Sequence, residues 1–302
     1  MRSIRMSIRL ALLFGLMVSV IGCGKPGPPP DKLTVEIAEQ QMASAELVID
    51  LIEFTTIEDE AAEILAKHPG GLNLDGLTSL SDSAAESLAK QNGDLGLGGL
   101  KSLSDAQVKI LSKHQGGGAL CLSGLTELSG AQVESLSRYQ GMLDLSGVTA
   151  ISDSAAAALA KVNGDLVLNG LISLSDAAAE SLAMHRGGRG RLLLSGLTSL
   201  TDAQAKSLSR HQGGLVLEGL TSLTDAQAKS LSMHKSDLAL NGLTSLSETA
   251  AESLAKHKGG LALRGLISLS DAAAESLAKH QGSYLLIKYD NLPPSAAEIL
   301  KK

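Results

Sequence analysis

A unit of 23 residues repeats along most of this chain, and no other feature constrains its fold as strongly. Leu192–Lys206 reads LLLSGLTSLTDAQAK, and Leu215–Lys229 reads LVLEGLTSLTDAQAK. If the first Leu of each L-x-L-x-G-L is taken as an origin, eight of the ten steps are 23 residues and the other two are 25 and 26. The origins are Ile49, Leu72, Leu95, Leu120, Leu143, Leu166, Leu192, Leu215, Leu238, Leu261 and Tyr284. A fixed period of this length predicts a solenoid in which each coil packs on its neighbours.

Each unit contains two patterns with different periods. Leu215 and Leu217 alternate with other residues, which predicts a short strand with one buried face. Thr224-Asp225 then supplies a helix N-cap, and the small residues around Leu231 predict one apolar helix stripe. Neither element is stable alone, so the strands are expected to form a parallel sheet with the helices packed behind it.

Proline and glycine punctuate the predicted helices. Pro293-Pro294 are expected to open the last one, where their missing N–H groups do least harm. Gly93, Gly164 and Gly213 are expected to end others in the left-handed conformation, which turns the chain into the next strand.

The repeat resembles the leucine-rich repeat, L-x-L-x-x-(N/C)-x-x-L, from Ile49 to Lys302. Its T-D-x-x-A-x-x-L-[AS] half is similar to the cysteine-containing subclass. The resemblance implies an α/β solenoid, with a curved parallel sheet on the concave side and short helices on the convex side. Leu77, Leu125 and Val148 stand where that family has Asn or Cys, so its ladder of side chains bonded to the backbone is missing at this position.

The first residues have the pattern of an export signal. Arg2, Arg5 and Arg9 precede an apolar run, Leu10–Ile21, that is short for a membrane span. Its end, Val20-Ile21-Gly22-Cys23, resembles the lipobox of bacterial lipoproteins, which implies a diacylglyceryl group on Cys23. The alternatives are an ordinary cleavage site and an uncleaved anchor, and each of the three predicts an exported protein.

Composition then divides the chain into four parts. Residues 1–22 are predicted to be the signal peptide, and residues 23–32, rich in Pro and Gly, a semi-rigid tether. Residues 33–48 place apolar side chains along one side and predict a capping helix. Residues 49–302 are predicted to be a solenoid of eleven units.

Charge and aromatic content exclude nucleic-acid binding. The chain has 32 acidic and 26 basic residues, a net charge of −6, no Trp and five other aromatic residues. It therefore lacks both the phosphate-neutralising charge and the stacking platforms that nucleic acids require. The two cysteines, Cys23 and Cys121, imply no disulfide framework.

All seven histidines lie in one column, nineteen residues after an origin. A zinc ion needs ligands within about 2 Å of it, whereas neighbouring helices lie about 8–10 Å apart. The column is better explained by contact with the last carbonyl groups of the helices than by metal binding. Gln91, Tyr139 and Val162 occupy the same column and favour this structural role. The histidines are His68, His114, His185, His211, His234, His257 and His280.

No catalytic or nucleotide-binding motif appears, so neither an enzyme nor a cofactor is predicted. Variable residues between and after the alternating Leu are expected to point to the concave face. The candidate ligand-binding residues are Asn169, Glu218, Asn241 and Arg264 on this face, and Arg186, Arg189 and Arg191 in the longest inter-repeat loop. A tolerated insertion with solvated charges is the alternative for that loop.

The sequence therefore predicts a non-catalytic binding module of the cell envelope. Its partner is an unknown protein or envelope ligand, and its membrane contact is the N-terminal lipid, facing the periplasm or the cell surface. The alternative is a structural spacer or a self-associating envelope scaffold.

Overall fold

The computed structural model describes residues 31–44, 46–114, 117–185 and 190–302. Asp31–Lys302 forms one compact unit. The predicted signal peptide and Cys23 lie outside the described residues, as do Arg186 and Arg189.

The unit is built on a parallel sheet of eleven strands, with each strand hydrogen-bonded to the strand of the next repeat. Leucines that share a place in the repeat face each other, as Leu215 does Leu192 and Leu238. The strands are β2 (Val48–Asp50), β4 (Gly71–Asn73), β5 (Leu95–Gly96), β6 (Leu120–Cys121), β7 (Leu143–Asp144), β8 (Leu166–Val167), β9 (Leu192–Leu193), β10 (Leu215–Val216), β11 (Leu238–Ala239), β12 (Leu261–Leu263) and β13 (Leu285–Ile287).

One short helix follows each strand. The helices are α2 (Asp59–Leu65), α3 (Asp82–Leu88), α4 (Asp105–Leu111), α5 (Gly130–Leu136), α6 (Asp153–Leu159), α7 (Asp176–Ala183), α8 (Asp202–Leu208), α9 (Asp225–Leu231), α10 (Glu248–Ala255), α11 (Asp271–Leu277) and α12 (Pro294–Leu300). The predicted N-caps are confirmed, since a Ser or Thr oxygen accepts a backbone N–H at the start of α3 to α11.

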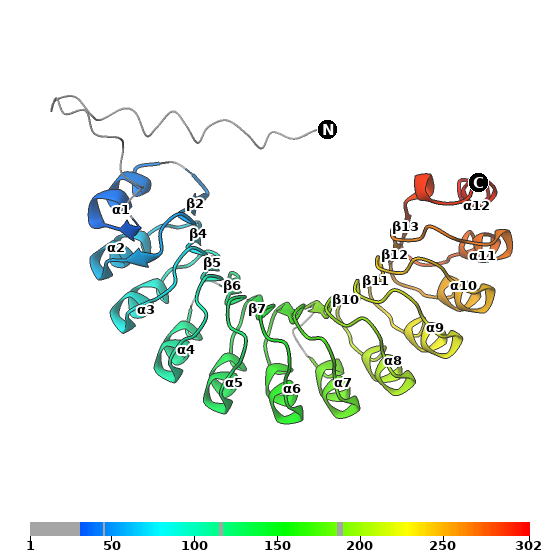
Figure 1. Ribbon diagram of the computed structural model, residues 1–302, viewed down its shortest axis with the longest axis horizontal. Coiled ribbons are helices and arrows are strands. Elements are labelled where there is room, and N and C mark those ends of the chain that lie inside the picture. The colour runs from blue at the N-terminus through cyan, green and yellow to red at the C-terminus, as the bar shows by residue number, and fades with distance from the viewer. Residues whose placement is uncertain (1–30, 45, 115–116, 186–189) are drawn as a thin grey trace. The chain divides into compact units, whose positions relative to one another are not determined.

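Within this unit the coils form an arc with the strands on the inner side and the helices on the outer side (Figure 1). The two layers need different spacings, because neighbouring strands lie about 4.8 Å apart and packed helices about 8–10 Å apart. Stacking coils of this kind fans the helices outward. The sheet therefore lines a concave face, as the sequence predicts.

The core lies between the two layers and consists mainly of leucine. Leu215, Leu217 and Leu220 from one strand segment and Leu231 from the following helix are all fully buried. Each fully buried Leu side chain stabilises the fold by about 2 kcal/mol relative to exposure. This core continues through all the coils as a single cluster.

The N-terminal cap differs from its predicted extent. Helix α1 spans Val35–Met42 rather than residues 33–48. Strand β1 (Lys32–Leu33) precedes it and pairs with β3 (Thr56–Ile57) in a separate two-stranded sheet. At the other end, Pro294 is the first residue of α12, as predicted.

The register of the last unit corrects one prediction. Leu285, not Tyr284, pairs with Leu261, so the final step is 24 residues. Leu286 pairs with Ala262. Tyr284 and Leu285 are both apolar, and alternation alone did not distinguish them.

The glycines at the ends of the helices have another role than the predicted one. Among the described glycines, a positive φ occurs at Gly117 (62°), in the first inserted loop. Gly93 and Gly213 are instead close to the preceding coil: a Cβ there would lie 2.2 Å from Gly70 O and 1.8 Å from Gly190 O. The prediction of left-handed caps at Gly93, Gly164 and Gly213 is therefore wrong, and close backbone approach explains why glycine is needed.

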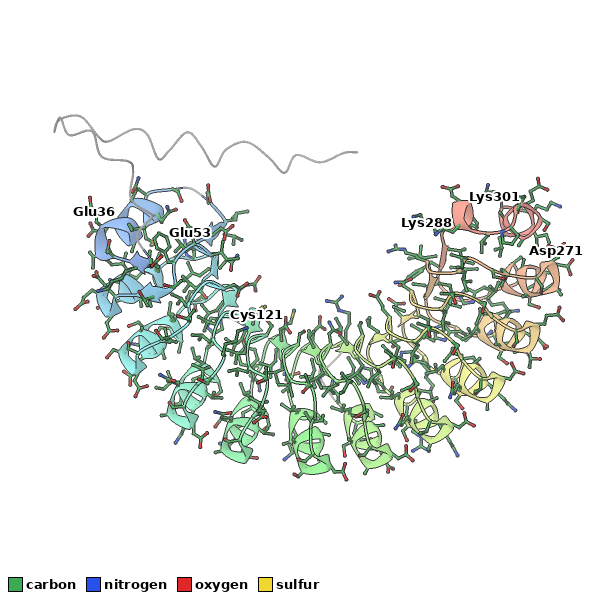
Figure 2. The ribbon with its side chains drawn as sticks, viewed as in Figure 1. Glu36, Glu53, Cys121, Asp271, Lys288 and Lys301 are labelled. Carbon is green, nitrogen blue, oxygen red and sulfur yellow. The ribbon has the colours of Figure 1, made fainter. Side chains whose placement is uncertain are left out.

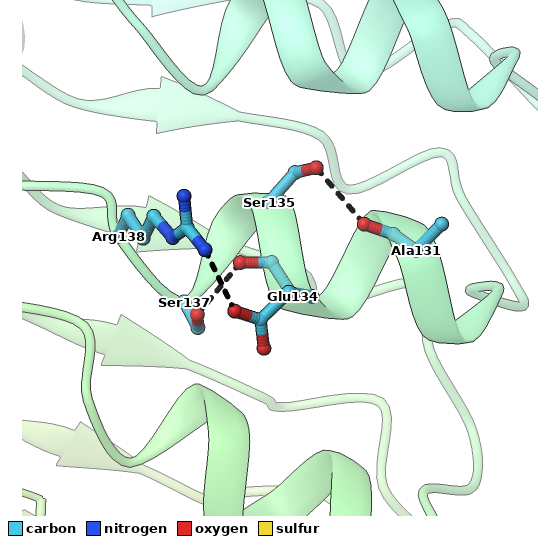
Figure 3. A network of polar contacts seen from close by, with 5 residues as sticks. All are labelled: Ala131, Glu134, Ser135, Ser137 and Arg138. Carbon is cyan, nitrogen blue, oxygen red and sulfur yellow. Dashed lines mark hydrogen bonds and ion pairs between the residues drawn. The ribbon is translucent and has the colours of Figure 1, made fainter.

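The outer face of the helices carries local polar contacts, as α5 shows (Figure 3). Arg138 forms an ion pair with Glu134 at 3.0 Å, and Ser135 Oγ donates to Ala131 O at 2.9 Å. Just after the end of α5, the buried Ser137 donates its Oγ–H to Glu134 O at 2.7 Å, away from this outer face. Exposed pairs of this kind contribute at most about 1 kcal/mol each, so the face is a solvated surface.

Candidate functional site

Two columns of side chains project from the concave side of the sheet. The first consists of the residue after each origin: Asp50, Asn73, Gly96, Cys121, Asp144, Val167, Leu193, Val216, Ala239, Ala262 and, with the corrected register, Leu286. It changes from mainly polar to apolar between β7 and β8. Figure 2 shows Cys121 on the strand side of the arc.

The second column lies two residues further along each strand segment and bonds neighbouring coils together. Asp75 accepts from Gly98 N (2.6 Å), Asn169 from Ser195 N (2.9 Å) and Asn241 from Arg264 N (3.0 Å). Side chains therefore do bond to the backbone of the next coil, at a position different from the family's Asn or Cys. Two candidate ligand residues, Asn169 and Asn241, contribute to this bonding.

Three candidate residues come together near the ends of β10 to β12. Asn241 Nδ2 donates to Glu218 Oε1 at 2.6 Å, and Arg264 lies in the next coil. Glu218 and Arg264 are exposed, whereas Asn241 is half-buried. These residues form a polar row, with an acidic, a neutral and a basic member, beside the apolar part of the first column. Asn169 lies in the coil of β8 and does not join this row.

Arg191 is held by an acidic partner in the preceding coil. Its guanidinium lies 2.7 Å from Asp165 Oδ2, and its backbone N donates to Asp165 Oδ1 at 2.7 Å. Asp94 and Asp237 accept backbone N–H groups of the next coil in the same way, at 2.7 and 3.0 Å. These three carboxylates were not among the predicted residues, and their sequence signal is an Asp just before an origin.

The Asp or Glu residues that begin α2 to α4 and α6 to α11 form an acidic column, and members of this column also link coils. Ser129 Oγ donates to Asp105 Oδ1 at 2.6 Å, and Thr201 Oγ1 donates to Asp176 Oδ1 at 2.8 Å. Each of these carboxylates thus stabilises its own helix N-terminus and accepts the N-cap hydroxyl of the next coil.

The N-terminal strands carry a more acidic surface. Asn73 Nδ2 donates to Asp50 Oδ1 at 3.0 Å, and Asp144 Oδ1 accepts from Ser146 N at 2.9 Å. Burial and the carboxylates of Asp144 and other nearby Asp residues raise the pKa of the Cys121 thiol to about 11. This cysteine therefore remains a thiol at neutral pH and is a poor nucleophile.

The histidine column is buried in the turns between helices and strands. His114 Nε2 donates to Gly93 O at 2.8 Å and His211 Nε2 to Gly190 O at 3.2 Å. Both carbonyl groups belong to the preceding coil, and the backbone of Ala89 and Ala183, at the ends of helices α3 and α7, also interacts with these rings. The predicted contact with helix-end carbonyl groups is therefore made with the helix of the preceding coil, so the column links coils.

Gln91 and Tyr139 occupy the same column and also donate to a carbonyl group of the preceding coil. Tyr139 Oη donates to Gly118 O at 2.9 Å, and Gln91 Nε2 donates to Gly70 O. The bond requires a donor of suitable reach, and several residue types supply it.

Burial lowers the pKa of five of these histidines. It lowers the pKa of His211 and of His234 to about 4, in each case with neighbouring histidines acting in the same direction. The pKa values of His114, His185 and His257 are also lowered, mainly by burial. These rings are therefore neutral at pH 7.

The described part of the chain offers no group of three or more His, Cys, Asp or Glu side chains that could hold a metal ion. Successive histidine rings stack nearly parallel instead of converging on one point. A search of the described residues for a helix long and apolar enough to cross a membrane also finds none.

The repeat and its parallel sheet make this fold a leucine-rich-repeat solenoid. Three solved structures are similar to this chain, each with a TM-score below 0.5. A leucine-rich-repeat protein of Leptospira interrogans is 18% identical with a TM-score of 0.46, and the match covers 88% of this chain and 66% of that one. An internalin of Listeria monocytogenes is 15% identical with a TM-score of 0.46, covering 83% and 73% of the two chains. Rad7 in its complex with Elc1 from yeast is 15% identical with a TM-score of 0.49, covering 87% and 81%.

No family model matches this sequence, and no curated protein matches it. The leucine-rich-repeat architecture therefore rests on the repeat and on the sheet described above. At such low identity the three solved structures carry no information about a ligand.

Proposed function

We propose that this chain is a non-catalytic binding module that holds a protein or cell-envelope ligand on its concave face. The proposal rests on the positions at which the repeat varies from coil to coil. The leucines of the core and the caps of the helices recur from coil to coil, whereas the first concave column changes from Asp50 to Val167 to Ala262. Residues that serve the fold alone are expected to repeat with it.

The chemistry of the concave face suits a broad and weak interface. Val167 and Ala262 are nearly buried, and Leu193 and Val216 are half-buried, so the apolar part is shallow. The concave columns contain no Trp or Tyr, the side chains that most often anchor tight interfaces. Affinity would therefore come from many small contacts along several coils.

A photo-crosslinking amino acid tests which face holds the ligand. We would place it at Arg264 on the concave side and, as a matched control, at Lys206 on α8; both positions are exposed and basic. The proposal expects a crosslinked partner from position 264 and none from position 206. A partner captured only from position 206 would move the interface to the helices.

The loop with Arg186, Arg189 and Arg191 remains a candidate for the rim of this interface. Guanidinium groups suit carboxylate or phosphate groups of a ligand. Replacing all three by Ala should weaken capture of the crosslinked partner, and Arg191→Ala alone separates loss of the Asp165 pair from loss of the ligand contact. Unchanged capture by the triple variant would remove the loop from the site.

We further propose that the chain is exported and anchored through a lipid on Cys23, facing the periplasm or the cell surface. The support is the lipobox-like Val20-Ile21-Gly22-Cys23 and the basic residues before it. Cys23→Ser should move the protein from the membrane fraction to the soluble fraction. Retention in the membrane fraction at the parental level would contradict the anchor.

A self-associating scaffold is the second candidate. Within the described residues, β2 pairs in the sheet with β4 alone. Beside this edge Leu47 is 86% exposed and Val48 53% exposed, a combination that favours pairing with another chain. Mass spectrometry of the crosslinked product distinguishes the candidates, because the scaffold gives only further copies of this chain.

A further inference from the structure

Five consecutive coils of the C-terminal half stack their histidines into a continuous ladder. Ring centroids are 5.6 Å apart between His185 and His211 and 6.3 Å apart between His211 and His234. The next two distances, to His257 and then to His280, are 6.1 and 6.2 Å. The first four rings are at most 2% exposed. The three inner rings, of His211, His234 and His257, thus each lie between the rings of the coils on either side.

The surroundings of the ladder offer little to balance positive charge. Among the residues that the structure describes, the carboxylate that acts on it is Asp165, beside His185. The titratable neighbours of His211, His234 and His257 are other histidines. Their remaining polar neighbours are backbone carbonyl groups, including Gly190 O and Ser209 O.

Along most of the ladder, hydrogen bonds do not offset the cost of burying the polar ring nitrogens. Both ring nitrogens of His185, His234 and His257 lack a hydrogen bond of good geometry. A second proton on such a ring adds a charge in a dry site, and protons on adjacent rings place like charges about 6 Å apart. Opening the coils to water relieves both costs.

We propose that the histidine ladder is an acid-sensitive device that opens the coils from β9 to β13 while the N-terminal coils stay folded. The linear architecture makes such partial opening possible, because each coil contacts only its neighbours and the stack can separate coil by coil. The N-terminal half interrupts the column with Gln91, Tyr139 and Val162, so no run of adjacent titratable rings forms there. His114 instead stacks on Tyr139, at 6.4 Å.

The chain itself provides the substitution that tests the device. Gln91 occupies the same column, is fully buried and donates to the carbonyl group of the preceding coil. The variant His211→Gln/His234→Gln/His257→Gln therefore keeps a buried donor in each coil and removes the three central titratable rings. His68→Gln/His114→Gln is the matched variant of the N-terminal half.

Hydrogen exchange followed by mass spectrometry on the full chain gives the readout, at neutral pH and at about pH 5, with labelling times scaled for the intrinsic exchange rate. In the wild type, protection of peptides from residues 192–287 should fall at least about tenfold relative to peptides from residues 48–145 at the lower pH. The triple variant should lose this relative fall, and the N-terminal double variant should keep it.

Equal loss of protection in both halves of the wild type would overturn the proposal. So would a triple variant that still opens its C-terminal coils like the wild type. If circular dichroism shows that the triple variant does not fold at neutral pH, the single variant His234→Gln takes its place, and its C-terminal coils must open less than those of the wild type.

Discussion

The coils before and after Val162 fill the same column of the repeat in different ways. Before it, the column holds His68, Gln91, His114 and Tyr139; after it, every member is histidine. At His114, Tyr139 and His211 the side chain performs the same task, donating to a carbonyl group of the preceding coil. The two halves therefore use the same kind of contact between coils, but only the C-terminal half has an unbroken run of histidines in this column.

A fall in pH should give the largest difference in stability between the two halves. The pKa of His211 and of His234 is lowered to about 4 in the fold, compared with an ordinary value of 6.5. Between these values the unfolded chain binds more protons than the folded chain, so the free energy of unfolding falls as the pH falls from 6.5 toward 4. Above pH 6.5 these two histidines have little effect on the free energy of unfolding. Between pH 6.5 and pH 4 each lowers it by roughly 3 kcal/mol.

Urea melts followed by circular dichroism measure this dependence, since the chain has no Trp. His211→Gln/His234→Gln should lose less stability than the wild type between pH 7 and pH 5. Parallel stability curves for the two proteins would show that these rings do not titrate differently on folding.

A core pair tests whether the halves are otherwise alike. Leu88 on α3 and Leu182 on α7 are both fully buried and occupy the same place in the repeat. Leu88→Ala and Leu182→Ala should each destabilise by roughly 2–5 kcal/mol at neutral pH, through lost burial and a cavity. A much larger loss in one half would show that the packing of the core, and not the histidine column, distinguishes them.

A smaller effect concerns the hydroxyl links between helix starts. Ser247 caps α10 and also donates to Asp225 of the preceding coil. Ser152 caps α6, but Gly130 replaces the preceding carboxylate, and the Ser152 hydroxyl contacts Ser154 instead. Both Ser→Ala changes should cost about 1 kcal/mol for the cap, and Ser247→Ala about 1 kcal/mol more. Equal losses in denaturant melts would mean that the link between coils adds no stability.

The sequence predicts those parts of the fold that lie within one repeat. Alternating leucines place the strands, and Ser-Asp or Thr-Asp pairs place the helix starts, because both patterns act over a few residues. Contacts between coils were missed, since they join residues 21 to 30 positions apart that only stacking brings together, as in the pair of Arg191 with Asp165.

The candidate site shows the same limit. Glu218, Asn241 and Arg264 lie near one another, because neighbouring strands place residues of the same register side by side, and their role in ligand binding stays a prediction. That Asn169 and Asn241 also bond the next coil was not foreseen, because an Asn at that position can face solvent or fold back on the backbone.

The protonation state of individual rings tests the contrast between the halves most directly. Nuclear magnetic resonance of ¹⁵N-labelled histidine, assigned with His211→Gln and His234→Gln, follows each ring as the pH is lowered. We expect His211 and His234 to remain neutral at pH 5.5 in the folded chain, with pKa values near 4. Titration of either ring near its ordinary value of 6.5, with the fold intact, would contradict it.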